Sequence, residues 1–291
     1  MLKEEYVDGI KVLLLIFLLT ILNLNIPIIS FLVNIILPVP VVYMIIKHGM
    51  NKTFFMILLS AVLSGLLIDP LMGLYTIIGF GLIGFVLGSA LKEEFSPRLT
   101  LILTISAVLI SNLIISGISS YLLDFNYHNL FNEIIEGLGS NPDLTELALN
   151  LEQQLELLKM LIPAFFVITS IISGTITYYL TLWYLKRIKL NKRVYKPIKY
   201  WYFTRWISVG IAICLLFKTN IYLVNLNMVL LFFVFLQGFA VGLYYLAKSP
   251  NSSGLTFLYI LLIILFNFFV FIILSLVGLI DMWFNLRKRK E

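Results

Sequence analysis

The sequence contains few of the residues on which most enzymes and metalloproteins depend. Its single cysteine, Cys214, stands in an apolar run of a 291-residue chain, so no internal disulfide can form. The two histidines, His48 and His128, lie far apart along the chain, at no spacing typical of metal ligands or of a nucleophile and its base. Charged residues make up only 12% of the chain. We therefore expect no metal site, no cofactor and no enzymatic activity.

Apolar residues are abundant instead, because 60% of the chain is hydrophobic and its mean hydropathy is +1.01. A soluble domain cannot bury that much apolar surface, so the partner that the composition implies is a lipid bilayer. A crossing helix needs about 20 mostly apolar residues, which makes the first and seventh apolar segments marginal. The composition predicts an all-α, polytopic bundle of transmembrane helices with eight or nine apolar segments. These segments cover 10–24, 28–46, 53–69, 71–91, 99–121, 161–184, 201–217, 222–246 and 255–279.

The distribution of charge predicts the orientation of the first six segments. The turn at 47–52 is basic, and the stretch 186–205 carries many Lys and Arg residues but no acid. The loop 122–160 between them is strongly acidic. By the positive-inside rule, the N-terminus and both basic stretches face the cytoplasm of a bacterial cell, and the acidic loop lies outside its cytoplasmic membrane. Basic stretches of this kind indicate membrane orientation rather than nucleic-acid binding.

The acidic loop has the pattern of amphipathic helices. Residues 127–138 form one such pattern, and a second begins at Asn141-Pro142-Asp143, which has the features of a helix N-terminus. These extracellular helices either cover the outer mouth of the bundle or rest on the lipid headgroups.

The last third of the chain allows two topologies. Three further spans would place the basic tail outside, against the positive-inside rule. If 201–217 only dips into the bilayer, two spans remain and the tail returns to the cytoplasm. We therefore divide the chain into a six-helix core (1–185), a basic cytoplasmic loop (186–205) and C-terminal membrane helices with a basic tail (206–291). The residues expected at the membrane interface are Lys192, Arg193, Trp201, Asp281, Trp283, Arg287 and Lys288.

The glycine run at 79–88 contains the spelling G-x-G-x-x-G. A dinucleotide site would need a preceding strand and a later acidic residue, whereas this run lies inside an apolar segment. On an ideal α-helix, four glycines in and near this run fall within an arc of roughly 80°. We therefore predict that they serve helix packing in lipid. These glycines are Gly73, Gly81, Gly84 and Gly88.

A few polar and helix-breaking residues inside the apolar segments are candidate ligand contacts. Pro38 and Pro40 free backbone carbonyls, which either only kink the helix or line a cavity. Asp69 before Pro70 either caps a helix or contacts a ligand at the outer side. Mid-segment amides either join neighbouring helices or bind a ligand. These amides belong to Asn112, Gln237 and Asn267.

Two short stretches resemble a family. Ile26-Pro27-Ile28 with Leu37-Pro38-Val39-Pro40, and the ending from Gly278 to Lys288, are similar to the YybS-like bacterial integral membrane proteins. The first six segments also resemble the substrate-binding S components of energy-coupling-factor vitamin transporters. That resemblance implies a ligand site near the outer face, with the acidic loop in the place of a lid. Residues 11–19 lack the small residues through which such subunits dock to their coupling subunit.

Together these features favour binding, or assisted transport, of a small and largely apolar molecule in an S-component-like manner. The absence of charged residues in the middle of the segments argues against ion coupling. The alternative is a membrane scaffold in cell-envelope assembly or sporulation, which would recruit another membrane protein.

Overall fold

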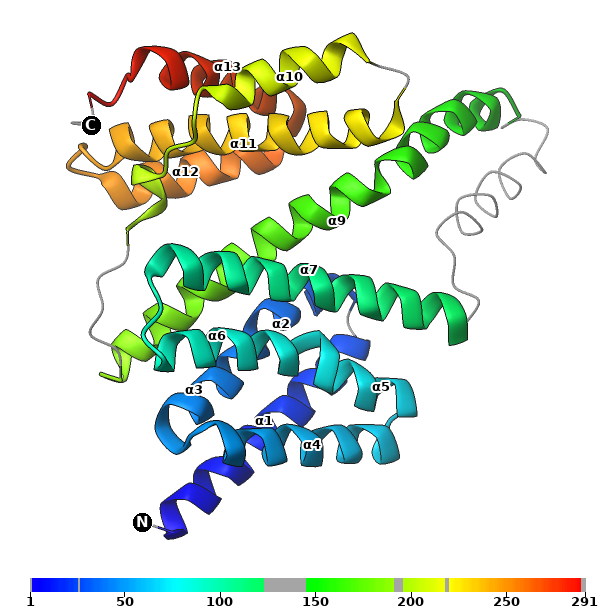
Figure 1. Ribbon diagram of the computed structural model, residues 1–291, viewed down its shortest axis with the longest axis vertical. Helices are drawn as coiled ribbons and strands as arrows, with labels where there is room; N and C mark the ends of the chain where they lie inside the picture. The colour runs from blue at the N-terminus through cyan, green and yellow to red at the C-terminus, as the bar shows by residue number, and fades with distance from the viewer. Residues whose placement is uncertain (1, 26, 123–144, 191–195, 218–219, 289–291) are drawn as a thin grey trace. The chain divides into compact units, whose positions relative to one another are not determined.

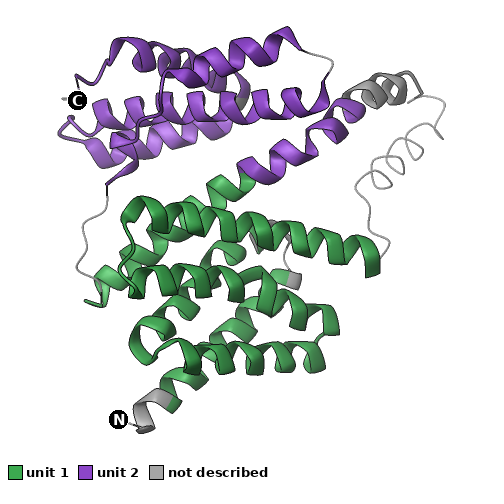
Figure 2. Ribbon diagram, in the orientation of Figure 1, with its two compact units in different colours: residues 1–137, 169–194 green, residues 138–168, 195–291 purple. Residues whose placement is uncertain are grey.

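The computed structural model describes residues 2–25, 27–122, 145–190, 196–217 and 220–288 (Figure 1). The chain divides into two compact units (Figure 2). Unit 1 consists of residues 1–137 and 169–194, and unit 2 consists of residues 138–168 and 195–291. The helix α9 (Thr145–Arg187) contributes its first part to unit 2 and its remainder to unit 1.

The predicted fold class is confirmed. Regular structure in the described residues is entirely helical, and seven stretches are long and apolar enough to cross a membrane. A pair of helices bent by 118° would raise the number to eight only if the pair crossed as one span. The seven stretches are Tyr6–Asn23, Ser30–His48, Met50–Leu67, Pro70–Lys92, Pro97–Leu122, Leu155–Arg187 and Ile221–Leu246.

Unit 1 is built around α3, which is buried along most of its length and packs against α1, α4 and α6. Its core includes Ile16 of α1, Val41 and Ile45 of α3, and Ile57 of α4. The helices of this unit before α9 are α1 (Leu2–Asn25), α2 (Pro27–Ile36), α3 (Pro38–His48), α4 (Met50–Leu67), α5 (Pro70–Tyr75), the π-helical turn η1 (Thr76–Gly81), α6 (Leu82–Lys92) and α7 (Pro97–Leu122).

The packing glycines make close contacts, but with two different neighbours. A Cβ atom on Gly73 would lie 2.8 Å from the carbonyl oxygen of Ala61 in α4, and one on Gly84 would lie 2.6 Å from Cβ of Val41 in α3. Gly81 likewise faces Ile57 of α4, and Gly88 faces Ile45 of α3. A π-helical turn contains more residues than an α-helical turn, so η1 changes the phase between Gly73 and Gly84. The four glycines therefore serve two helix contacts rather than one stripe.

The predicted single segment 255–279 is divided in the structure. The helix α12 (Ser252–Leu265) ends at Phe266, and α13 (Asn267–Phe284) leaves at an angle of 118°. The directions of the contacts explain the break. Rings of Phe239 and Tyr259 stack, so α12 runs back along α11 (Ile221–Leu246) after the short turn that joins them. A single straight helix that ran back along α11 in this way could not also take the direction of α13.

The helix α13 runs parallel to α11. Its residues Phe271 and Leu274, and Leu286 just beyond its end, contact Phe235, Gly238 and Tyr245 of α11, in the same order along both segments. Two glycines, Gly238 and Gly278, let the backbones approach so closely that a Cβ on either would overlap backbone atoms of the other helix.

The seventh predicted segment contains α10 (Trp206–Leu216), which has 11 residues and is about 16 Å long, roughly half the hydrocarbon thickness. It runs antiparallel to α11, since Phe203 contacts Phe233 while Gly210 faces Leu230.

Four helix ends therefore lie together at one end of unit 2: the start of α10, the end of α11, the start of α12 and the end of α13. The tail and the basic stretch meet there, because Nη1 of Arg287 donates to the carbonyl of Lys199 over 2.8 Å. This contact does not fit the three-span topology, which separates the two segments across the membrane.

A side chain of α11 bonds the α9 backbone next to Pro163, which has no N–H of its own to donate. In a regular helix the amide of Ala164 donates to the carbonyl of Met160 four residues earlier. Asn225 of α11 accepts from the Ala164 amide and donates to the Met160 carbonyl, both over 2.8 Å. One amide side chain thus satisfies both backbone groups and joins α9 to α11 within unit 2.

Candidate functional site

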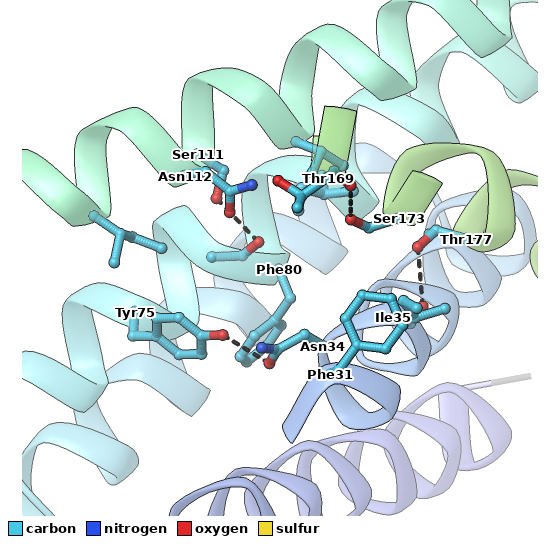
Figure 3. Close-up of a pocket in the computed structure, with 14 residues that line it drawn as sticks. Phe31, Asn34, Ile35, Tyr75, Phe80, Ser111, Asn112, Thr169, Ser173 and Thr177 are labelled. Atoms are coloured by element: carbon cyan, nitrogen blue, oxygen red, sulfur yellow. Dashed lines mark hydrogen bonds between the residues drawn. The ribbon is translucent and has the colours of Figure 1, made fainter. Parts of the chain in front are cut away.

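A cavity of about 190 Å³ lies within unit 1 (Figure 3). Helices α2, α6, α7 and α9 and the turn η1 supply its walls, and Tyr75 at the end of α5 also lines it. Apolar side chains make up much of the lining, and the polar members are uncharged amides, hydroxyls and one phenol. The lining residues are Phe31, Asn34, Ile35, Tyr75, Gly79, Phe80, Ile83, Val108, Ser111, Asn112, Ile115, Thr169, Ser173 and Thr177.

The π-helical turn shapes one wall. Because such a turn bonds each amide to a carbonyl five residues earlier, it disturbs the regular backbone pairing around it. The hydroxyl of Ser111 on α7 donates to the carbonyl of Ile78 over 2.7 Å and reaches that of Gly79 at 3.2 Å. A serine on the facing helix thus holds the irregular backbone beside the cavity, where π-helical turns often mark functional sites.

Three hydroxyl residues of α9 form the opposite wall. Thr169, Ser173 and Thr177 are spaced by four residues, so they lie on one face of this apolar helix. Ser173 donates to the carbonyl of Thr169, and Thr177 donates over 3.2 Å to the carbonyl of Ile35 (Figure 3). Ile35 lies between Asn34 and Ile36, whose carbonyls lose their amide donors because Pro38 and Pro40 have no N–H. Thr177 thus adds a hydrogen bond where the α2–α3 backbone is broken.

Two amides give the cavity its remaining hydrogen-bonding capacity. The phenol of Tyr75 donates to Oδ1 of Asn34 over 2.7 Å, and Nδ2 of Asn112 donates to the hydroxyl of Ser170 over 3.2 Å. Within the described part of the chain, Nδ2 of Asn34 has no acceptor and Oδ1 of Asn112 has no donor. The cavity therefore offers one amide donor and one amide acceptor beside apolar and hydroxyl-bearing walls.

The sequence-predicted ligand residues do not gather at one place. Asn112 lines the cavity, whereas Pro38 and Pro40 are buried next to the residues that line it. Asp69 caps α5, because its carboxylate accepts from the amide of Leu71 over 2.8 Å. Gln237 belongs to unit 2. Asn267 begins α13, and its side chain lies outside the described residues.

Gln237 is part of a buried polar cluster in unit 2. The side chains of Asp281 and Arg287 are fully buried and form a salt bridge over 2.8 Å. Gln237 donates to the same carboxylate oxygen and accepts from the amide of Phe203 over 2.9 Å. This pair is thus buried within the unit, where it fixes the tail and the stretch before α10 against α11 and α13. In a low-dielectric interior each charge needs the other.

The other predicted interface residues have varied surroundings. Trp283 is 55% exposed, with the guanidinium of Arg205 5.8 Å from its ring centroid. Trp201 is half-buried and Lys288 is exposed. Lys192 and Arg193 lie outside the described residues, as do the predicted lid helix at 127–138 and the helix start at Asn141-Pro142-Asp143.

Unit 1 also holds a charged cluster away from the cavity. Asp8 of α1 receives hydrogen bonds from Lys47 over 2.5 Å and from Tyr43 over 3.1 Å, and Nε2 of His48 lies 3.1 Å from the same oxygen. These contacts tie the start of α1 to the end of α3. Among the described residues, no group of three or more His, Cys, Asp or Glu is arranged to hold a metal.

Several cavity residues were not predicted from the sequence. The i, i+4 spacing of Thr169, Ser173 and Thr177 in an apolar segment is a signal that could have revealed the α9 wall. Asn34 and Tyr75 meet across 41 residues of chain, and no local pattern predicts that contact.

Comparisons with known proteins give one family and no close relative. No curated protein and no solved structure matches this chain. The match to the family described as "Predicted membrane protein (DUF2232)" extends over residues 14–282, nearly the whole sequence. The chain therefore belongs to this family of membrane proteins.

Proposed function

We propose that unit 1 captures a small, uncharged and largely apolar molecule in its cavity, and that this capture serves transport in an S-component-like manner. The supporting observation is the pairing of apolar walls with the unused donor of Asn34 and acceptor of Asn112. A small number of well-placed polar groups on apolar walls is the usual composition of ligand pockets. No Asp, Glu, Lys, Arg or His is among the described lining residues, so a charged ligand would remain unpaired there.

The volume limits the size of the ligand. At about 190 Å³ the cavity is somewhat larger than an engineered apolar cavity of about 150 Å³ that binds benzene. It is smaller than the roughly 300–1,000 Å³ of most drug-sized ligand pockets. We therefore propose a ligand with a single ring or a short branched chain, carrying one hydrogen-bond acceptor and one donor.

Ligand capture can be tested with the purified full-length chain in detergent. Neutral one-ring compounds, such as cresols and cyclic alcohols, are screened for an increase in Tm. Asn112→Leu should abolish the shift, since Leu has a similar volume but cannot accept a hydrogen bond. Val108→Phe should also abolish it by filling the cavity, because Val108 is buried and lines the wall.

The matched control is Ile110→Phe. Ile110 lies on the same helix, is 50% exposed and is absent from the lining. This variant should keep the wild-type shift. An equal loss in Ile110→Phe, or an unchanged shift in both cavity variants, would contradict binding at this site. Assisted transport is tested by uptake of the identified compound into proteoliposomes. The compound should enter proteoliposomes that contain the wild type and should not enter those that contain Asn112→Leu.

A further inference from the structure

The basic end of unit 2 contains a compact group of lysines and tyrosines outside the cavity. We define the lysine–tyrosine cluster as Lys199, Tyr200, Tyr244, Tyr245 and Lys248. Tyr200 and Tyr244 are in ring contact with centroids 6.3 Å apart, and Tyr244 contacts Tyr245 at 5.5 Å. The cluster joins the 3-10 turn Ile198–Tyr200 (η3) to the end of α11, which are far apart in the sequence.

The two lysines are held against the aromatic rings. Nζ of Lys199 lies 5.2 Å from the ring centroid of Tyr200, and Nζ of Lys248 lies 4.4 Å from that of Tyr244 and 5.0 Å from that of Tyr245. Such cation–π contacts orient an ammonium group but leave its charge in place. Neither lysine has an ion pair within the described part of the chain.

Acidic residues are scarce in the described C-terminal part of the chain, residues 196–217 and 220–288. Between residues 196 and 290 the sequence contains Asp281 as its single acid, and Asp281 is already buried against Arg287. Arg287 also binds the carbonyl of Lys199 and thereby fixes the backbone from which one cluster lysine extends. Because the carboxylate of Asp281 is paired with Arg287, it does not neutralise Lys199 or Lys248, and the cluster keeps its positive charge.

The place of the cluster in the fold indicates its partner. It lies where the apolar helices α11 and α13 end, and the last turn of α13 carries the large exposed side chains of Trp283 and Phe284. Apolar helix ends, exposed aromatics and unpaired lysines occur together at the level of the lipid headgroups. We propose that the lysine–tyrosine cluster binds the phosphate of an anionic glycerophospholipid, with Lys199 and Lys248 as donors and the three tyrosine rings holding them in position.

The proposal can be tested by tryptophan quenching with brominated lipid. The full-length chain with Trp183→Phe, whose remaining tryptophans belong to unit 2, is reconstituted in phosphatidylcholine containing brominated phosphatidylglycerol or brominated phosphatidylcholine. We expect stronger quenching by the anionic lipid. Lys199→Ala/Lys248→Ala should reduce that preference roughly thirtyfold, given about 1 kcal/mol per lysine. Tyr244→Leu should also reduce it without a change of charge, and Tyr244→Phe should retain it.

The control removes two lysines elsewhere. Lys186→Ala/Lys189→Ala lowers the charge equally but affects exposed residues at the end of α9 in unit 1. This variant should keep the preference. An equal loss in this control, or an unchanged preference in Lys199→Ala/Lys248→Ala, would overturn the proposal. So would displacement of the lipid by an excess of soluble glycerol phosphate, because the site would then bind a free anion.

Discussion

At the scale of single residues, two features carry much of the packing: glycines where helices touch, and polar side chains that satisfy broken backbone or buried charge. Asn225 bonds the Ala164 amide and the Met160 carbonyl next to Pro163 in α9. Ser111 bonds the carbonyls of Ile78 and Gly79 within η1. Both are uncharged, as expected where the surroundings are apolar and each unsatisfied backbone group is costly.

The glycine contacts predict a position-dependent effect of one methyl group. Gly84→Ala should lower Tm by several degrees, because its Cβ would lie 2.6 Å from Cβ of Val41 and 2.9 Å from the carbonyl oxygen of Pro38. Overpacking of this kind costs about 1–3 kcal/mol. Gly117→Ala on α7 is the control, since nothing lies within 4 Å of its added Cβ. Equal Tm values for the two variants in detergent would show that the α3–α6 contact is not tight.

The buried ion pair predicts non-additive substitutions. Arg287→Met should destabilise unit 2 by about 3–5 kcal/mol, because it leaves the carboxylate of Asp281 buried without its cation. Asp281→Asn/Arg287→Met should recover most of that loss, since no buried charge remains and Gln237 keeps an acceptor. Thermal unfolding of the wild type, the single variant and the double variant measures the recovery. A double variant less stable than Arg287→Met would refute this account.

At the scale of elements, hydrophobic segments predicted the helices well and their ends less well. Apolar length predicted the seven membrane-length stretches because it follows directly from bilayer thickness. The break at Phe266 was missed because both halves are apolar, and only the contacts of α11 with α12 and α13 require it. The phase change at η1 was also missed, because an ideal 100° rotation per residue assumes an uninterrupted α-helix.

The α12–α13 hairpin predicts where the C-terminal half can be labelled. In a Cys214→Ser background, single cysteines at Lys248 and Asn285 should react with a membrane-impermeant maleimide from the same side of the membrane. The reason is that Tyr245 of α11 donates to the carbonyl of Leu286, which brings both positions to one end of unit 2. Labelling of the two positions from opposite sides would contradict the hairpin.

At the scale of the whole molecule, the sequence predicted that lipid surrounds the chain, but it predicted few of the residues that line the cavity. Composition alone indicated lipid, and Asn112 was the one predicted ligand residue that lines the cavity. The other cavity residues come from segments far apart in the sequence, and the bond from Thr177 to Ile35 joins residues 142 positions apart. Contacts at that distance depend on tertiary packing, which hydropathy does not encode.

Orientation is the prediction that belongs to this scale. We expect cysteines at Lys52 and Lys189 to be shielded from an impermeant maleimide in intact cells, and one at Glu146 to react, because the basic stretches face the cytoplasm and the acidic loop faces outward. Permeabilised cells should label all three positions, which controls for expression. Reaction at Lys189 with protection at Glu146 in intact cells would reverse the proposed sidedness.

The division of α9 between the units has a consequence for biogenesis. Unit 1 is not completed by the first 137 residues, because the wall formed by Thr169, Ser173 and Thr177 is translated after the part of α9 that belongs to unit 2. While the ribosome is still synthesising the acidic loop, the earlier helices must wait in the bilayer with that side of the future cavity open. A nascent chain stalled before α9 would therefore lack this wall and leave the amides of Asn34 and Asn112 uncovered on that side.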